Sequence, residues 1–355
     1  MRSRAWSELG RQAWHLAAAG WLGLTALSAW ATVGYTVLPA TETAQPVSVF
    51  YPASAPAQAE SHGPFQFDLA HDAAPQPGNH RLIVISPGSG ASPWVYFDLT
   101  HLLVSKGYVV AMPEHAGDND HDHSRVGPLS WQRRPIEVSQ AIDRVAADPR
   151  FHAEINFAKV GMYGMSAGGH TALTLAGGQW SPSQLKAHCM AHVADDFQSC
   201  AGTITRLTGG WMDGLKRTIV RWVDEVKFND TRWFSHTDAR IQAIVAGVPF
   251  AADFDPDSLR DPPVPLALIS ARHDQWLNPA FHSDAIAQAC RTCVHLYDVE
   301  QGGHGALLSP LPPIRGGVLG DLIADPADFD RAHEVPRINQ AIETFFSQRL
   351  IGPTP

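Results

Sequence analysis

Short runs of consecutive apolar residues, bounded by glycine or proline, recur along the chain from residue 82 onwards. Runs without apolar–polar alternation indicate strands that are buried on both faces, as in a parallel sheet. The predicted strands are Leu82–Ser86, Tyr108–Met112, Val160–Met165, Ile241–Val248, Val264–Ser270 and Val294–Val299.

Stretches with helical spacing lie between these runs. The predicted helices are Trp94–Lys106, Pro135–Ala147 with Pro135 in the first turn, a segment after Ser166, Asn278–Ala289 and Arg337–Leu350. The last helix places five apolar residues on one face: Ile338, Ile342, Phe345, Phe346 and Leu350. Strand–helix alternation predicts an α/β fold with a mostly parallel central sheet and helices on both faces.

Two segments depart from this alternation. Before residue 81, we expect Val33–Leu38 and Val47–Tyr51 to form two antiparallel strands and residues 52–80 to form mainly loop. Residues 179–239 contain Trp211, Trp222 and Trp233, together with an amphipathic helix near Leu215–Val226. We expect them to form a cap-like insertion over the sheet edge. Its apolar face should pack on the domain or in part wall a pocket.

The composition mainly excludes some classes of protein. Apolar residues make up 45% of the 355 residues and charged residues 17%, which excludes a disordered chain. Acidic residues outnumber basic residues by 35 to 26, so the formal net charge is −9. Because binding to nucleic acid needs a basic footprint, no DNA or RNA partner is expected.

The N-terminal segment has the pattern of an export signal. Arginines occur before residue 12, and residues 13–31 contain no acidic residue, lysine or arginine and end in Ala29-Trp30-Ala31. This pattern predicts a cleaved signal peptide over residues 1–31, a mature domain over residues 32–355 and a secreted or periplasmic location. After cleavage no membrane span is expected. An uncleaved anchor is the alternative, because about 19 apolar residues can just span a bilayer.

Four cysteines fit an exported chain. Proximity in the sequence favours the pairs Cys189–Cys200 and Cys290–Cys293 among three possible connectivities. Redox exchange by the Cys-x-x-Cys pair is less favoured, because Cys290 ends an alanine-rich helical stretch instead of starting a helix. A four-cysteine zinc site is also less favoured, because only one pair has zinc-ligand spacing.

The motif Gly164-Met165-Ser166-Ala167-Gly168 lies between a predicted strand and a predicted helix start. This is the context of a nucleophile elbow, in which glycines let strand and helix approach closely and the serine hydroxyl is exposed above the sheet. We therefore expect Ser166 to be a nucleophile instead of an ordinary turn residue. The oxyanion hole is expected to use the backbone N–H groups of Ala167 and Ser89.

A serine nucleophile needs a base and an orienting carboxylate. Asp274 follows the fifth predicted strand, and His304 lies in a glycine-rich loop after the sixth. Catalytic groups gather beyond the carboxyl ends of such strands, in the chain order Ser, acid, His. We therefore expect Asp274 to be the acid and His304 the base. Asp253 and Asp255, which follow the fourth predicted strand, are the alternatives for the acid.

The stretch Glu114–His123 is rich in Asp and His and resembles the start of a calcium-binding EF-hand loop. Such a loop needs glycine at its sixth position and glutamate at its twelfth, where this chain has His123 and Leu129. We expect a solvated loop here, with a surface metal ion as the alternative. No resident metal or cofactor is expected.

The chain resembles the α/β-hydrolase superfamily and, within it, bacterial exported hydrolases similar to platelet-activating-factor acetylhydrolase, often described as dienelactone-hydrolase-like. The resemblance extends from about Val33 to Phe346 and is carried by Val84–Gly90, Gly107–Ala111, Glu114-His115, Arg134-Pro135, Tyr163–Gly169 and the cysteine-bearing insertion. It implies an α/β-hydrolase fold, and it places the nucleophile, acid, base and oxyanion amides on the same five residues as above.

Two positions depart from that family, because related enzymes commonly have histidine at Pro87 and at Met165. Dienelactone hydrolases use a cysteine nucleophile, so Ser166 argues against that activity. The resemblance implies hydrolysis of a small-molecule or lipid ester through an acyl-enzyme, without a cofactor. A serine peptidase or amidase on the same fold is the alternative, because the triad does not distinguish esters from amides.

Overall fold

The computed structural model describes residues 32–352. The predicted signal peptide, residues 1–31, lies outside the described residues. Between residues 32 and 352, no helix combines the length and the apolar character that crossing a bilayer requires.

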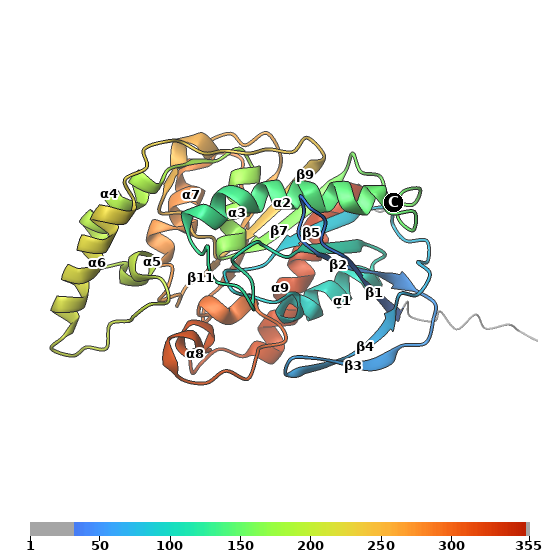
Figure 1. The fold of residues 1–355 in the computed structure, drawn as a ribbon, viewed down its shortest axis with the longest axis horizontal. Helices are drawn as coiled ribbons and strands as arrows, with labels where there is room; N and C mark the ends of the chain where they lie inside the picture. The colour runs from blue at the N-terminus through green and yellow to red at the C-terminus, as the bar shows by residue number, and fades with distance from the viewer. Residues whose placement is uncertain (1–31, 353–355) are drawn as a thin grey trace, which may run out of the picture. The chain divides into compact units, whose positions relative to one another are not determined.

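The central sheet has ten strands in the order β12-β11-β9-β7-β5-β6-β2-β1-β4-β3 (Figure 1). Their bounds are β1 Thr32–Leu38, β2 Val47–Ala53, β3 Gln58–His62, β4 Phe65–His71, β5 Leu82–Ser86, β6 Val109–Pro113, β7 Val160–Met165, β9 Ile241–Gly247, β11 Leu266–Ala271 and β12 Val294–Val299. The strands from β12 to β6 are parallel to one another. Strands β5, β6, β7 and β11 are buried at every position, which confirms the predicted parallel core.

Helices cover both faces of this sheet. Their bounds are α1 Phe97–Ser105, α2 Pro128–Ala147, α3 Ala167–Leu175, α4 Pro182–His192, α5 Phe197–Ala201, α6 Asp213–Lys227, α7 Ser283–Ala289, α8 Gly317–Ile323 and α9 Arg331–Phe346. Helices α1 and α9 pack on one face, and α2, α3 and α7 pack on the other (Figure 1). All five predicted apolar residues of the last helical segment are buried. The predicted fold class is therefore confirmed.

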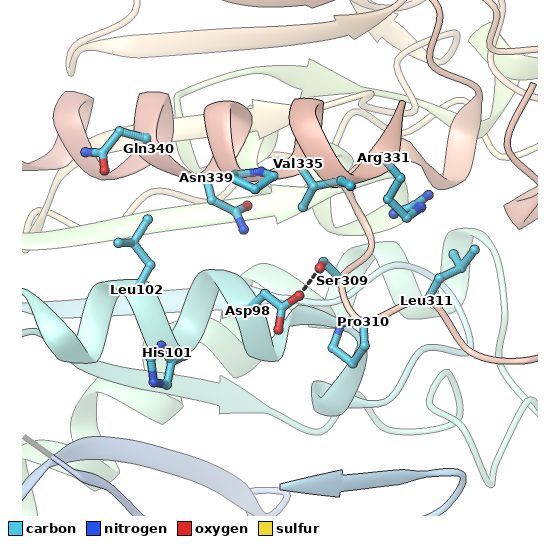
Figure 2. A pocket seen from close by; sticks show the side chains of 12 residues that line it. Asp98, His101, Leu102, Ser309, Pro310, Leu311, Arg331, Val335, Asn339 and Gln340 are labelled. Atoms are coloured by element: carbon cyan, nitrogen blue, oxygen red, sulfur yellow. Dashed lines mark hydrogen bonds between the residues drawn. The ribbon is translucent and has the colours of Figure 1, made fainter. Parts of the chain in front are cut away.

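Helices α1 and α9 do not pack along their whole length. A cavity of about 650 Å³ lies between them (Figure 2). Within its lining the Ser309 hydroxyl donates a hydrogen bond to the Asp98 carboxylate, which ties α1 to the loop after β12. None of the predicted site residues lines this cavity.

Two sequence-based predictions of local structure are wrong. Residues 58–71, predicted as loop, form the hairpin β3–β4 around Gly63, whose φ of +59° suits a tight turn. Alternation in β4 buries Phe67 and Leu69, but the surrounding alanines and histidines obscured that period. Helix α2 begins at Pro128, not at Pro135. Pro135 lies inside the helix, which tolerates the lost hydrogen bond because its apolar face packs on the sheet.

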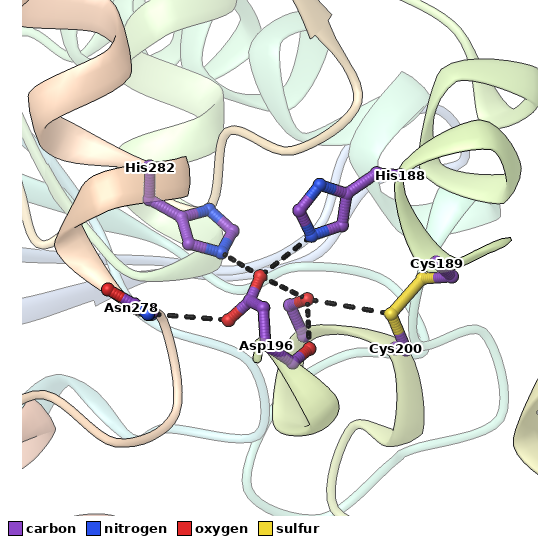
Figure 3. The surroundings of a disulfide bond; sticks show 7 residues. His188, Cys189, Asp196, Cys200, Asn278 and His282 are labelled. Carbon is purple, nitrogen blue, oxygen red and sulfur yellow. Dashed lines mark hydrogen bonds and ion pairs between the residues drawn. A yellow bond between two sulfur atoms is a disulfide. The ribbon is translucent and has the colours of Figure 1, made fainter. Parts of the chain in front are cut away.

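Residues 179–239 contain α4, α5, α6 and the short strand β8, Gln179–Trp180, which pairs with β10, Phe254–Asp255. A second link is formed by the Asp196 carboxylate, which lies 2.8 Å from His188 Nε2 and 3.0 Å from His282 Nε2 (Figure 3). Burial alone would raise the pKa of Asp196, but these two imidazoles hold it well below its usual range. The ion cluster therefore anchors the segment to the short helix that precedes α7.

The cysteines pair as predicted. Cys189–Cys200 joins α4 to α5, and Cys290–Cys293 closes the turn between α7 and β12. Each pair links positions that are close in the sequence, so each fixes local structure instead of joining distant parts of the fold.

Candidate active site

Ser166 occupies a sharp turn between β7 and α3. Its backbone has φ +58° and ψ −118°, a conformation that residues with a Cβ rarely adopt. Two hydrogen bonds hold it there: the Ser166 N–H donates to the Gly247 carbonyl (3.1 Å), and its carbonyl accepts from the Phe250 N–H (3.1 Å). The turn is therefore fastened to the end of the neighbouring strand β9.

The glycines of the turn are required by close backbone contacts. A Cβ at Gly164 would lie 1.9 Å from the Gly168 oxygen, and a Cβ at Gly168 would lie 1.9 Å from the Ser86 oxygen. Neither contact can be relieved by rotating a side chain, since both partners are backbone atoms. The motif thus has the strand–turn–helix geometry that the sequence predicts for it.

The three residues predicted as nucleophile, base and acid come together. His304 Nε2 lies 3.0 Å from Ser166 Oγ, and His304 Nδ1 lies 2.7 Å from Asp274 Oδ2. Because a carboxylate only accepts hydrogen bonds, Nδ1 carries the proton and the lone pair of Nε2 faces the serine hydroxyl. Both His304 and Asp274 are buried.

Further contacts orient the acid and the base. The other oxygen of Asp274, Oδ1, accepts hydrogen bonds from the backbone N–H groups of Trp276 (2.8 Å) and Leu277 (2.9 Å). The guanidinium of Arg331, at the start of α9, donates to the Gly305 carbonyl next to His304 (3.0 Å). These bonds fix the carboxylate and the loop that carries the imidazole.

The alternative acids lie elsewhere. The carboxylate of Asp253 is fully buried and lies 3.2 Å from His170 Nε2. Asp255 caps a short helix, where its carboxylate accepts the N–H of Asp257 (3.1 Å). The geometry therefore gives His304 the partner Asp274.

The loop after β5 leaves one amide free between two that are engaged. The Gly88 N–H donates to the Tyr96 hydroxyl (2.8 Å), and the Gly90 N–H donates to Asp118 Oδ1 (3.1 Å). Within residues 32–352, the N–H groups of Ser89 and Ala167 have no protein acceptor. Ala167 is the first residue of α3, where the helix dipole favours negative charge.

A buried ion pair holds this loop. Arg134 of α2 is fully buried, and its guanidinium donates to the Pro87 carbonyl (2.6 Å) and to the Asp118 carboxylate (2.8 Å). Asp118 in turn accepts the Ser89 hydroxyl (2.6 Å). Burial opposes ionisation of Asp118, but Arg134 and the hydroxyls of Ser89 and Ser130 lower the pKa of Asp118. We call Arg134 and Asp118 the loop clamp.

The loop clamp was not predicted from the sequence, and the prediction for the stretch around Asp118 is wrong in part. His115, Asp118 and Asn119 are buried, so the stretch Glu114–His123 is not simply a solvated loop. His115 links Ser86 (2.8 Å) to Glu137 (2.7 Å). These residues pair with each other. Within the described chain, the one group of His, Cys, Asp or Glu side chains close enough together for a metal ion is Cys189, Cys200 and Asp224, and there the two sulfurs already form a disulfide. Arg134-Pro135 and Glu114-His115, which carried the family resemblance, were the available signal.

An apolar cavity of about 400 Å³ opens at Ser166, Ser89 and His304. The tip of the β3–β4 hairpin and the segment around α8 wall it, through side chains that include Phe65, Ile314, Leu319, Leu322 and Ile323. No residue of the segment 179–239 lines it, so the expectation that the tryptophans there wall this pocket is wrong. Seven residues of that segment instead line a second, more polar cavity of about 760 Å³, which also reaches His304: Ala194, Asp195, Phe197, Gln198, Arg206, Leu207 and Thr208.

Comparisons with known proteins support the fold. The chain matches no family model and no curated protein. Among solved structures it is similar to a ferulic acid esterase from Streptomyces cinnamoneus, with a TM-score of 0.52 and 16% sequence identity. The similarity covers 87% of this chain and 84% of that chain. At this identity the likeness establishes a shared α/β-hydrolase-like architecture.

Proposed function

We propose that the chain is a serine hydrolase that cleaves carboxylic esters, of the esterase, lipase or acetylhydrolase type, through an acyl-enzyme. One observation carries the proposal: Ser166, His304 and Asp274 form a continuous hydrogen-bonded series at the mouth of an apolar cavity. The strained turn at Ser166 adds to it, because such strain persists only where the surrounding structure maintains it.

In the acylation step, Ser166 Oγ attacks the ester carbonyl carbon while His304 Nε2 accepts the hydroxyl proton. Negative charge develops on the carbonyl oxygen, and the N–H groups of Ser89 and Ala167 are positioned to stabilise it. His304 then donates the proton to the departing alkoxide oxygen. Asp274 keeps the imidazole in the required tautomer and stabilises its protonated form.

In the deacylation step, a water molecule takes the place of the alcohol. His304 accepts a proton from this water as its oxygen attacks the acyl carbon, and Ser166 leaves as its hydroxyl after His304 returns the proton. The residues that hold the loop and the triad need not move between the two steps. Each partial reaction can therefore use the same arrangement.

The lining of the cavity supports an apolar group next to the scissile ester. Pockets of this kind bind ligands through apolar contacts, and a few polar groups set the orientation. Here Ser166 and His304 are among the few polar residues of the lining, and Phe65, Leu319 and Leu322 supply apolar surface. The solved neighbour is a ferulic acid esterase, so an esterase has been built on this architecture.

We further propose that the protein is exported, with cleavage after Ala31, and that it is related to hydrolases similar to platelet-activating-factor acetylhydrolase. The two disulfides support an oxidising location. The sequence motifs described above support the relationship.

Labelling with a fluorophosphonate tests the nucleophile. The wild-type protein should gain one adduct at Ser166, because Ser166 Oγ displaces fluoride, and Ser166→Ala should gain none. A panel of p-nitrophenyl esters and matched anilides then separates an esterase from an amidase. Labelling at another residue, or equal turnover by Ser166→Ala, would overturn the proposal.

A further inference from the structure

Helix α6 is oriented with its apolar side outward. Five residues form a continuous stripe along it, which we call the outward stripe, and each is between 36% and 66% exposed: Leu215, Ile219, Trp222, Val223 and Val226. Trp211, just before the helix, is 92% exposed. A helix on the surface of a water-soluble domain normally turns such a stripe toward the core.

The side of α6 that faces the protein is polar. Asp213, Val220 and Asp224 are its buried residues, and Arg217 is half-buried with an Nε that has no hydrogen-bond partner. Burial raises the pKa of Asp224 to about 7, and its Oδ2 is also without a partner. Helix α6 lies against α4 and α5, and Val220 is its one buried apolar residue. Its apolar side is therefore available to a partner outside the domain.

The charges beside the stripe are mainly positive. Helix α6 carries four basic and three acidic residues, although the whole chain has a net charge of −9. Asp213 is paired with Lys216 (2.9 Å), and Asp224 is buried. Glu225 is thus the one exposed acid against Arg221, Lys227 and the half-buried Arg217.

We propose that the outward stripe of α6 docks on a phospholipid surface, with its basic residues against the phosphate groups. Tryptophan, leucine and isoleucine on one side of a helix and arginine and lysine beside them match the interface between lipid and water. A second copy of the chain is a poorer match, because a two-fold contact through the stripe would bring the basic residues beside it close to those of the other copy.

The position of the stripe in the chain relates it to the cavities. Leu207 and Thr208 line the more polar cavity that reaches His304, and Trp211 begins the exposed apolar surface three residues later. A lipid surface held by α6 would therefore adjoin the rim of that cavity. If the protein is the ester hydrolase proposed above, on which this step rests, its substrates are esters that are presented at a lipid surface.

Sedimentation with vesicles tests docking without requiring catalysis. The full chain with Ser166→Ala is mixed with phosphatidylcholine vesicles, with and without phosphatidylglycerol at a ratio of roughly 7:3. We expect sedimentation with the anionic vesicles, and at least about tenfold weaker binding after Trp211→Ser with Trp222→Ser. Leu129→Ser with Ile136→Ser, on two exposed apolar residues of α2, is the control and should bind as before.

The charge contribution has its own variant. Arg221→Gln with Lys227→Gln should weaken binding to the anionic vesicles several-fold and leave binding to pure phosphatidylcholine nearly unchanged. Circular dichroism confirms that each variant is folded, and hydrolysis of a water-soluble ester by the same variants with Ser166 intact should be unaffected. A wild type that hydrolyses no ester would remove the proposed function but would leave the vesicle result interpretable.

Three outcomes would overturn the docking proposal. The chain could fail to bind either kind of vesicle, or the tryptophan variant could bind as tightly as the control. The third is a dimer in light scattering that the tryptophan variant loses while no vesicle binding is found, which would identify a second copy as the occupant.

Discussion

The hydrogen bonds of Asp274 distinguish the two oxygens of its carboxylate. Oδ1 accepts two backbone N–H groups, so Oδ2 is left to orient His304. Asp274→Asn would present an amide N–H or a rotated amide to Nδ1 and favour the wrong imidazole tautomer. We expect turnover to fall about 10⁴-fold with the fold intact.

Variants of the other two triad residues, and a control, test the same assignment. Ser166→Ala and His304→Ala should each lower turnover by roughly 10³- to 10⁶-fold. Asp253→Asn should affect stability more than turnover, because Asp253 faces His170 in the core. Turnover of a soluble ester, measured for all four purified variants, decides the assignment. An Asp253→Asn protein that is folded and inactive, beside an active Asp274→Asn protein, would make Asp253 the acid.

The hydrogen bonds on either side of Ser89 give a second prediction at the residue scale. Asp118 and Tyr96 engage the amides on either side of Ser89, so they hold the free N–H of Ser89 in a fixed direction. Tyr96→Phe and Asp118→Asn should lower kcat about 10- to 100-fold and leave KM nearly unchanged, because the loss is specific to the transition state.

A transition-state analogue separates positioning from general stability. Binding of a boronic acid should weaken in parallel with kcat in both Tyr96→Phe and Asp118→Asn. Ser105→Ala, which removes a hydroxyl that bonds only within α1, is the control and should change neither quantity. If analogue affinity is unaltered while the melting temperature drops, the network supports the fold and not the reaction.

The sequence predicted the triad residues and not the loop clamp, for a physical reason. Ser166, Asp274 and His304 each follow a strand of a parallel sheet, so the order of strands alone brings them to one edge. Arg134 and Asp118 meet through side-chain direction and burial, neither of which has a period in the sequence. The assignment of catalytic roles itself stays a prediction.

At the scale of elements, burial patterns decided which predictions hold. The continuous apolar runs of β5, β7 and β11 were recognisable because both faces are covered. Helix α6 was also predicted, but the expectation that its apolar face packs on the domain or in part walls the pocket at Ser166 is wrong, because that face is exposed. An amphipathic pattern specifies two faces without saying which one the protein covers. The hairpin β3–β4 was missed because only one of its faces is apolar and it is short.

Helix α6 predicts a pH dependence of stability through Asp224. Its folded pKa of about 7 lies above its ordinary value of 3.8, so its contribution to stability is fully present below about pH 4 and is lost as pH rises through 7. Asp224→Asn should therefore gain more stability over wild type at pH 8 than at pH 5, where only part of the effect has developed. Urea unfolding at both values measures this, with Glu225→Gln as the control on the exposed side. If the free energies of unfolding of wild type and Asp224→Asn differ by the same amount at pH 5 and pH 8, Asp224 is not a buried neutral carboxyl group.

The Cys189–Cys200 bridge acts on the same segment. It closes a loop of 11 residues, and in the chain-entropy model its removal should cost about 2–3 kcal/mol. Paired Cys189→Ala and Cys200→Ala substitutions should lower the stability of the segment 179–239, as detected by limited proteolysis. Turnover of a soluble ester should be retained, because the triad lies on other elements. Loss of the triad geometry in this variant would show that the segment supports the site.

At the scale of the whole molecule, segments far apart in the sequence form the cavity at Ser166. The β3–β4 hairpin supplies Phe65, and the region of α8 supplies Leu319 and Leu322. Leu319→Trp should shift preference toward shorter acyl chains by filling the cavity, whereas Trp222→Ala should leave the preference unchanged. Specificity constants for p-nitrophenyl esters from C2 to C12 measure both. A chain-length preference that changes in Trp222→Ala and not in Leu319→Trp would show that the segment 179–239 forms the acyl site.

The location of β12 at the edge of the sheet has a consequence for how the protein would lose activity. His304 follows this strand, which pairs only with β11 and is mostly half-exposed, whereas Ser166 follows the central strand β7. Edge elements open at lower free energy than core strands. Fraying of β12 would displace His304, the proposed base, while Ser166, the proposed nucleophile, stays in place. Inactivation in mild denaturant should therefore precede the change in circular dichroism and reverse on dilution. Hydrogen exchange should show the β12 amides opening at the denaturant concentration that abolishes turnover. Local opening of β12, and not global unfolding, would then limit how long the protein stays active.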